Sequence, residues 1–208
     1  MISSSQTLPD GYIQTVEINL AKNKGLAVLL NIVGLFISIL TFALLVWFTS
    51  FVRPGSFTVL IGFRVDLSTI GQLVALILFV TLSLIVHELI HGFFFWFFTH
   101  SRPVYALHLA YAYAAAPGWY IPACLYWIIG LAPLVLIDAV GILLSILSPA
   151  SWTLIIVFLV AFNTGGAVGD LWIAFHLFQV SPNCLVNDVG DGVTFYEPVK
   201  NWVEVKSE

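Results

Sequence analysis

Four long apolar stretches constrain this chain more than any other feature of its sequence. Each has at most one Asp, Glu, Lys or Arg, and they cover residues 25–51, 70–98, 121–147 and 152–180. A helix needs about 20 mainly apolar residues to cross the hydrocarbon core of a bilayer, and each stretch is long enough. The sequence therefore predicts an all-α membrane protein, with four transmembrane helices bundled in a single domain over residues 1–208.

The overall composition agrees with this expectation. Hydrophobic residues make up 60% of the chain and charged residues 9%, and the mean hydropathy is +1.02. Soluble domains carry about 25% charged residues, so a water-exposed surface of the usual kind cannot be built from this sequence. The net charge of −4 includes no basic cluster, which argues against nucleic acid as a partner. Cys124 and Cys184 form no metal-binding or redox pattern.

The first apolar stretch is expected to stay in the protein as a membrane anchor. It is longer than the core of about 7 to 15 residues that a cleaved signal peptide has, and no small-residue cleavage site follows it. Lysine and arginine gather in cytoplasmic loops. With both termini inside, the cytoplasmic segments hold Lys22, Lys24, Arg102, Lys200 and Lys206, and the outer side holds Arg53 and Arg64. We therefore expect a multi-pass protein of the plasma or inner membrane with both termini cytoplasmic.

Three segments outside the apolar stretches have the pattern of extended chain. The clearest is "PVYALHLAYAYAAAPG", residues 103–118, where larger side chains alternate with alanines. Alternation with a period of two is typical of a strand, and we expect one over residues 104–114 at the cytoplasmic face. The N-terminal "LPDGYIQTVEINL" and the C-terminal "SPNCLVNDVGDGVTFYEP" also suggest short β segments in the tails.

The second apolar stretch contains the sequence "HELIH", residues 87–91. On a helix, His87 and His91 lie only about 40° apart, while Glu88 lies at the border of the same face. Two histidines at this spacing with a glutamate after the first form the H-E-x-x-H pattern of zinc hydrolases. Ionisable residues at membrane depth are costly to insert and are functional by default. We expect His87 and His91 to bind zinc and Glu88 to act on the water.

A catalytic zinc ion takes three protein ligands, so a third must come from another helix. The second and fourth apolar stretches run in the same direction, and Asp170 lies at nearly the same depth as His87. Asp138 lies on a helix of the opposite direction, nearer the other side of the membrane, although a bend at Pro133 could reduce the difference. Asp170 is therefore the expected third ligand, Asp138 the alternative, and His176 and His108 are weaker candidates.

Asn163 precedes Asp170 by two helical turns, in the glycine-rich "NTGGAVGD". It is a candidate substrate-binding or oxyanion-stabilising residue. A buried asparagine also commonly forms hydrogen bonds between membrane helices, and this second interpretation stays open.

The chain resembles an integral-membrane family of zincin peptidases of unknown function and, more distantly, the site-two proteases. The resemblance rests on "VHELIHG", "LAPL" at residues 131–134, "GD" at 169–170 and "NDVGDGVTFYEP" near the C-terminus. Site-two proteases take their third ligand from an L-D-G sequence. This chain has "IDAVG" at residues 137–141, which keeps Asp138 as an alternative. The resemblance implies a peptidase.

We therefore expect a zinc-dependent membrane-embedded peptidase that cleaves peptide or membrane-protein substrates in or near the bilayer. Zinc would activate the water and Glu88 would serve as general base. The alternative is a zinc-binding membrane protein without proteolytic activity, either a transporter or a catalytically dead adaptor.

Overall fold

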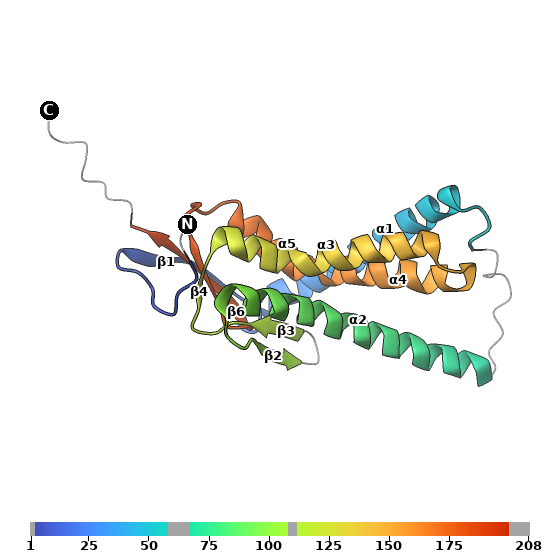
Figure 1. The fold of residues 1–208 in the computed structure, drawn as a ribbon, viewed down its shortest axis with the longest axis horizontal. Coiled ribbons are helices and arrows are strands. Elements are labelled where there is room, and N and C mark those ends of the chain that lie inside the picture. Colours follow the sequence, from blue (N-terminus) through green and yellow to red (C-terminus); the bar gives the residue numbers. More distant parts are fainter. Residues whose placement is uncertain (1–2, 58–66, 108–111, 200–208) are drawn as a thin grey trace, which may run out of the picture.

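The computed structural model describes residues 3–57, 67–107 and 112–199 of the chain (Figure 1). Arg64, Lys200, Lys206 and His108 lie outside these residues. Within the described part the chain forms five helices: α1 (Lys24–Val52), α2 (Leu67–Thr99), α3 (Ala123–Leu147), α4 (Ala150–Gly166) and α5 (Val168–Leu177).

Three of these helices match the first three predicted membrane spans. α1, α2 and α3 are each long enough and apolar enough to cross a bilayer. Large apolar side chains cover their outer surfaces, and on α1 they include Trp47, which is 68% exposed, and Phe51, which is 78% exposed. So much exposed apolar surface is unfavourable in water and suits contact with lipid.

The fourth predicted span is not one continuous helix, and the expectation for residues 152–180 is corrected here. α4 and α5 meet at Ala167 with a bend of 43°, and only together do they match a membrane span in length. Gly165 and Gly166 end α4, and glycine is the residue that weakens a helix most after proline. Gly165 also packs closely on α1, since a Cβ added to it would lie 2.4 Å from the Gly34 carbonyl oxygen.

The predicted extended tails pair with each other in an antiparallel sheet, which the sequence did not indicate. The strand order is β1 (Tyr12–Asn19), β6 (Gly192–Pro198), β5 (Leu185–Asp188) and β4 (Tyr120–Pro122). β4 includes Ile121 and Pro122, which were expected to begin the third helix. The sheet lies at one end of the helices, and the first and last strands of the described chain are neighbours in it (Figure 1).

The strand expected over residues 104–114 is a hairpin instead. β2 (Val104–Leu107) pairs antiparallel with β3 (Ala112–Ala115), and residues 108–111 between them lie outside the described part. Large and small side chains alternate in both strands. The period of two residues therefore does not show where the chain reverses direction. The hairpin lies against α2 (Figure 1), and its Tyr105 ring occupies the space where a Cβ on Gly92 would be.

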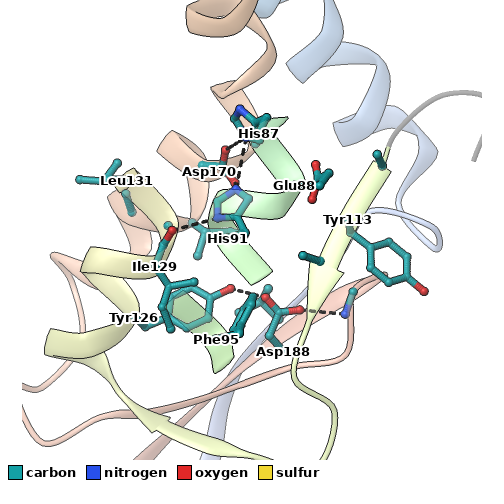
Figure 2. Close-up of a pocket in the computed structure, with 18 of the residues that line it drawn as sticks. His87, Glu88, His91, Phe95, Tyr113, Tyr126, Ile129, Leu131, Asp170 and Asp188 are labelled. Carbon is teal, nitrogen blue, oxygen red and sulfur yellow. Dashed lines mark hydrogen bonds and ion pairs between the residues drawn. The ribbon is translucent and has the colours of Figure 1, made fainter. Parts of the chain in front are cut away.

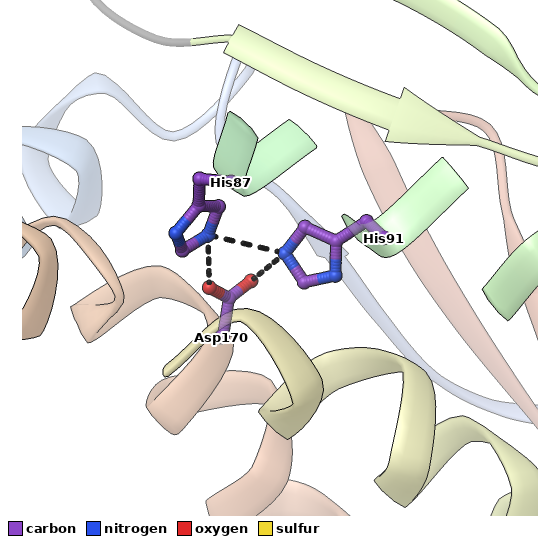
Figure 3. A group of neighbouring side chains, drawn as sticks. All are labelled: His87, His91 and Asp170. Carbon is purple, nitrogen blue, oxygen red and sulfur yellow. Dashed lines mark hydrogen bonds and ion pairs between the residues drawn. The ribbon is translucent and has the colours of Figure 1, made fainter. Parts of the chain in front are cut away.

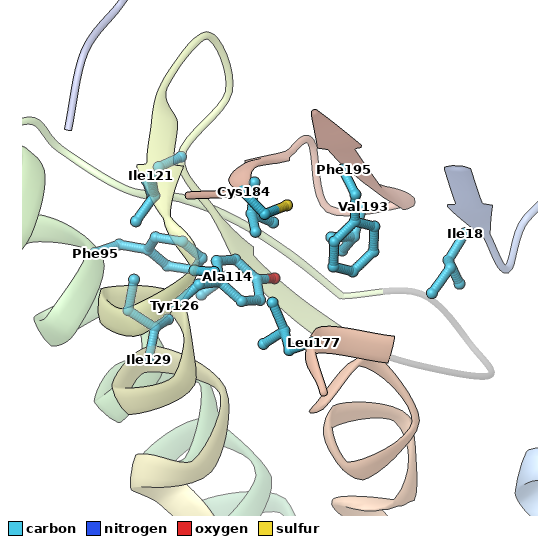
Figure 4. Close-up of a cluster of buried hydrophobic side chains, with 13 residues drawn as sticks. Ile18, Phe95, Ala114, Ile121, Tyr126, Ile129, Leu177, Cys184, Val193 and Phe195 are labelled. Carbon is cyan, nitrogen blue, oxygen red and sulfur yellow. The ribbon is translucent and has the colours of Figure 1, made fainter. Parts of the chain in front are cut away.

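A cluster of buried apolar side chains joins the four-stranded sheet to the helices. Phe95 of α2, Tyr126 of α3 and Leu177 of α5 meet Val186 and Phe195 of the sheet, and each is at most 5% exposed (Figure 4). A core packed this closely resists displacement of any one member. The ends of α2, α3 and α5 are therefore held together on one side of the sheet.

Candidate metal centre

His87 and His91 lie one turn apart on α2 with their rings side by side. Their Nε2 atoms are 3.2 Å apart, and both residues are less than 10% exposed. The i,i+4 spacing gives this arrangement, because side chains four residues apart lie above one another on a helix. The close approach predicted for the two histidines is present.

Asp170 reaches the two imidazoles from the first turn of α5. Its Oδ2 lies 3.2 Å from His87 Nε2 and its Oδ1 lies 3.4 Å from His91 Nε2 (Figure 3). The bend at Ala167 directly precedes this turn. The break between α4 and α5 therefore lies next to the carboxylate that faces α2.

The ring of His91 is oriented by a backbone carbonyl. Its Nδ1 lies 2.9 Å from the carbonyl oxygen of Ile129 in α3. A carbonyl oxygen only accepts, so Nδ1 carries a hydrogen, and in the neutral ring Nε2 keeps its lone pair. Pro133, four residues after Ile129, has no N–H to donate to that carbonyl within the helix. The proline of "LAPL" thus leaves open an acceptor that His91 uses.

The donor atoms of His87, His91 and Asp170 form a set that suits zinc. They all lie within 4.8 Å of one another, and His87, His91 and Asp170 form the one such group found among the residues that the structure describes. Imidazole nitrogen and carboxylate oxygen are common zinc ligands, and three protein ligands are the usual number at a catalytic zinc site. A cation among these atoms would offset the repulsion between their facing lone pairs.

Glu88 lies beside this group without belonging to it. Its Oε2 is buried and has no hydrogen-bond partner among the described residues, and Ala114 of β3 lines the same cavity. A buried carboxylate oxygen without a partner is costly in an apolar setting. Its position next to the three donor atoms suits a group that takes a proton from a water molecule there.

The four residues share one cavity of about 180 Å³ (Figure 2). Its walls come mainly from α2, α3 and α5, together with β3, β5 and β6, and they include Gly130 and Gly169. Small residues on two helices leave room beside the imidazoles.

One comparison with known proteins identifies a family. Residues 80–185, slightly more than half of the chain, match the family described as "Putative zincin peptidase". The chain belongs to this family. The description supports a zinc peptidase in general, and the matched segment includes His87, Glu88, His91 and Asp170. No curated protein and no solved structure matches the chain.

In this zincin-family protein the cavity has two further polar residues that the sequence did not single out. Tyr126 of α3 donates its hydroxyl hydrogen to Asp188 Oδ2, and the backbone N–H of Gly190 donates to Asp188 Oδ1 at 2.8 Å (Figure 2). Burial is the main cause that raises the pKa of the Asp188 carboxyl to about 6. Asp188 lies in the "NDVGDG" segment, but no spacing rule connects it to the histidines.

The remaining sequence candidates of this zincin-family chain lie apart from the three donor atoms. Asp138 hydrogen-bonds to Asn163 and Thr164, and Asn163 in turn contacts His87 Nδ1. His176 contacts the carbonyl oxygen of Trp172 on its own helix. The structure thus groups Asp170, and not Asp138 or His176, with the imidazoles. His108 lies outside the described residues.

Proposed function

We propose that the protein is a zinc-dependent peptidase embedded in the membrane. His87, His91 and Asp170 would hold the metal, and Glu88 would be the general base. One observation carries this proposal: three suitable ligand atoms converge in a cavity that also contains a buried carboxylate oxygen without a partner. The family membership supports the same reaction class.

Zinc, when bound, would polarise the scissile carbonyl and acidify a water molecule. Glu88 would accept one proton from that water while the oxygen of the water bonds to the carbonyl carbon. The carbon–nitrogen bond of the peptide then breaks, and Glu88 returns the proton to the departing amine. The products are a carboxylic acid and an amine, and Glu88 ends in the state in which it began.

The β2–β3 hairpin is the proposed site for an extended substrate. Added strands bind through main-chain hydrogen bonds along an open edge. β3 pairs with β2 on one side and contributes Ala112, Tyr113 and Ala114 to the wall of the cavity that Glu88 also lines. A peptide running beside β3 would therefore pass the metal ligands. The small alanine side chains would leave room for those of the substrate.

The substrate would be a peptide or a membrane protein cleaved within the bilayer or beside it. The cavity is lined partly by β3, β5 and β6, and these strands lie at one end of the helices (Figure 1). The positive-inside rule applied to the loop lysines and arginines favours a cytoplasmic position for this end. Both termini would then be cytoplasmic, in a plasma or inner membrane.

The test compares the wild-type protein with Glu88→Gln in membranes that contain candidate substrates. New protein N-termini, identified by mass spectrometry, should appear with the wild type and fall by about 100-fold or more with Glu88→Gln, because the amide cannot accept the proton. Zinc content should be the same in both. Gln14→Glu, on the exposed face of β1, is the matched control and should cleave normally.

Two outcomes would contradict the proposal. If the same N-termini appear with Glu88→Gln, another protein produces them. If the protein binds zinc but no cleavage product depends on Glu88, the non-proteolytic alternative, a zinc transporter or an inactive adaptor, would account for the site.

A further inference from the structure

Behind His87, on the side of the ring opposite the other metal-binding candidates, three polar side chains form a connected hydrogen-bond chain. His87 Nδ1 lies 2.9 Å from Asn163 Oδ1, and Asn163 Nδ2 donates to Asp138 Oδ1 at 2.9 Å. Thr164 Oγ1 lies 2.7 Å from Asp138 Oδ2 and 2.9 Å from the carbonyl oxygen of Val160. The chain thus crosses from α2 through α4 to α3.

This network determines where the hydrogen of His87 lies. Asn163 donates through its NH₂ group to Asp138, so its oxygen faces His87 and can only accept. Nδ1 of His87 therefore carries the hydrogen, and Nε2, which faces Asp170, keeps its lone pair. Asp138 Oδ1 accepts in the same way whether the carboxyl is ionised or protonated on Oδ2. In the second case Thr164 accepts from Asp138 and donates to Val160.

Asp138 lies at an unusual place for an acidic side chain. It is a carboxyl group in the middle of a membrane helix, and its hydrogen-bond partners among the described residues are Asn163 and Thr164. Such groups are expensive in a membrane and usually serve a function. If these polar residues only joined helices, their hydrogen bonds would not have to lead to the ring of His87, a candidate metal ligand.

We propose that Asn163 and Asp138 are positioning residues for the metal site. They hold His87 in the tautomer and ring rotation that present Nε2 to zinc, and Asp138 does so without touching the metal. Partners of this kind commonly change metal affinity by about 10- to 100-fold when they are removed. The inference rests on the proposed zinc site, but it concerns metal binding and does not require peptide cleavage.

The first test measures zinc affinity of the purified full chain by competition with a chromophoric chelator. Asn163→Leu and Asp138→Leu should each lower the affinity by about 10- to 100-fold. Asp138→Asn should stay within a few-fold of wild type, because its amide oxygen still accepts from Asn163 while its NH₂ group faces Thr164. Thr153→Val is the matched control on α4, since the Thr153 hydroxyl is buried without a partner among the described residues.

A purely structural role predicts a different pattern. Replacing a membrane carboxyl by leucine would then alter thermal stability and leave zinc affinity unchanged in the protein that folds. Wild-type affinity in both leucine variants would overturn the proposal, as would an Asp138→Asn protein as weak as Asp138→Leu.

A second readout keeps the proposal testable if the leucine variants do not fold. In metal-free wild-type protein with ¹⁵N-labelled histidine, NMR at a pH where the His87 ring is neutral should show its hydrogen on Nδ1. A hydrogen on Nε2 would mean that the donors and acceptors in the hydrogen bonds from His87 to Asn163 and Asp138 are reversed. The proposal would then be wrong. This measurement tests the positioning of His87 even if the wild type takes up no zinc. A lack of zinc would contradict only the proposed function.

Discussion

At the residue scale, the site is organised by which nitrogen of each imidazole is already engaged. His91 Nδ1 hydrogen-bonds to the carbonyl oxygen of Ile129, and His87 Nδ1 hydrogen-bonds to the amide oxygen of Asn163. Both Nε2 atoms are left facing the carboxylate of Asp170. Two rings fixed in this way need little rearrangement to bind a cation, which reduces the entropy lost on binding.

Asp170→Asn should lower zinc affinity by more than about 100-fold, beyond the effect expected for residues behind the ligands. The amide keeps the size of the side chain but lacks the negative charge that offsets the cation. Chelator competition on the purified protein measures the change. Asp10→Asn, an exposed substitution near β1, should bind zinc as the wild type does. Equal affinity in the two variants would remove Asp170 from the ligand set.

The sequence predicted the residues of the site better than their surroundings. His87, Glu88 and His91 follow from one local spacing on one helix, and the depth of Asp170 follows from the length of two helices that run the same way. For Asn163 the sequence left open a substrate contact and a hydrogen bond between helices, and in the structure its side chain hydrogen-bonds to His87 and Asp138. That contact depends on the rotation of α4 about its axis relative to α2. This rotation cannot be predicted from the sequence pattern of a single helix.

At the element scale, two helices with local irregularities complete the site that α2 begins. α5 begins after the bend at Ala167 and carries Asp170 in its first turn, and α3 contains Pro133 beside the carbonyl that orients His91. A regular helix uses its backbone groups internally, so polar contacts at membrane depth become available where a helix is broken or lacks a donor. The bend between α4 and α5 was not predicted, because the hydrophobic pattern continues through it.

Pro133→Ala should make α3 more regular while weakening the metal site. Alanine restores an N–H that can donate to the Ile129 carbonyl, and it removes a proline that costs about 3 kcal/mol inside a helix. Thermal stability should therefore rise or stay unchanged. Zinc affinity should fall by a few-fold, because the oxygen has two lone pairs and His91 must share it. Unchanged or higher zinc affinity would show that the carbonyl does not orient His91.

At the scale of the whole molecule, the sheet, the hairpin and the ends of the helices form one unit around the cavity. β5 brings Asp188 to the cavity wall, and Tyr126 connects it to α3. The sequence indicated extended tails, and the structure confirms them as strands. Their pairing with each other joins segments from opposite ends of the chain, and such long-range partners cannot be read from local patterns.

The pH dependence of stability should report on Asp188. Its pKa in the folded protein, about 6, is above the ordinary 3.8, so the fold favours the protonated carboxyl. The stabilising contribution is therefore present at low pH and is lost as the pH rises from about 4 to above 6. Asp188→Asn resembles the protonated form and should gain stability relative to wild type over that range. Thermal unfolding with the metal state held constant measures this difference.

The control for this experiment is Asp10→Asn, whose melting temperature should follow that of the wild type at every pH. A constant difference between wild type and Asp188→Asn across the same range would show that Asp188 is not buried as a protonated group. The measurement tests the junction between sheet and helices and does not depend on peptidase activity.

If the histidines of "HELIH" and Asp170 form a zinc site, the purified chain should hold zinc, and its metal content can be measured. Elemental analysis after dialysis against zinc should find about one zinc ion per chain in the wild type and in Glu88→Gln. His87→Ala, His91→Ala and their double variant should retain little or none at the same protein concentration. A wild type without zinc, or a double variant that still holds one ion per chain, would contradict the account.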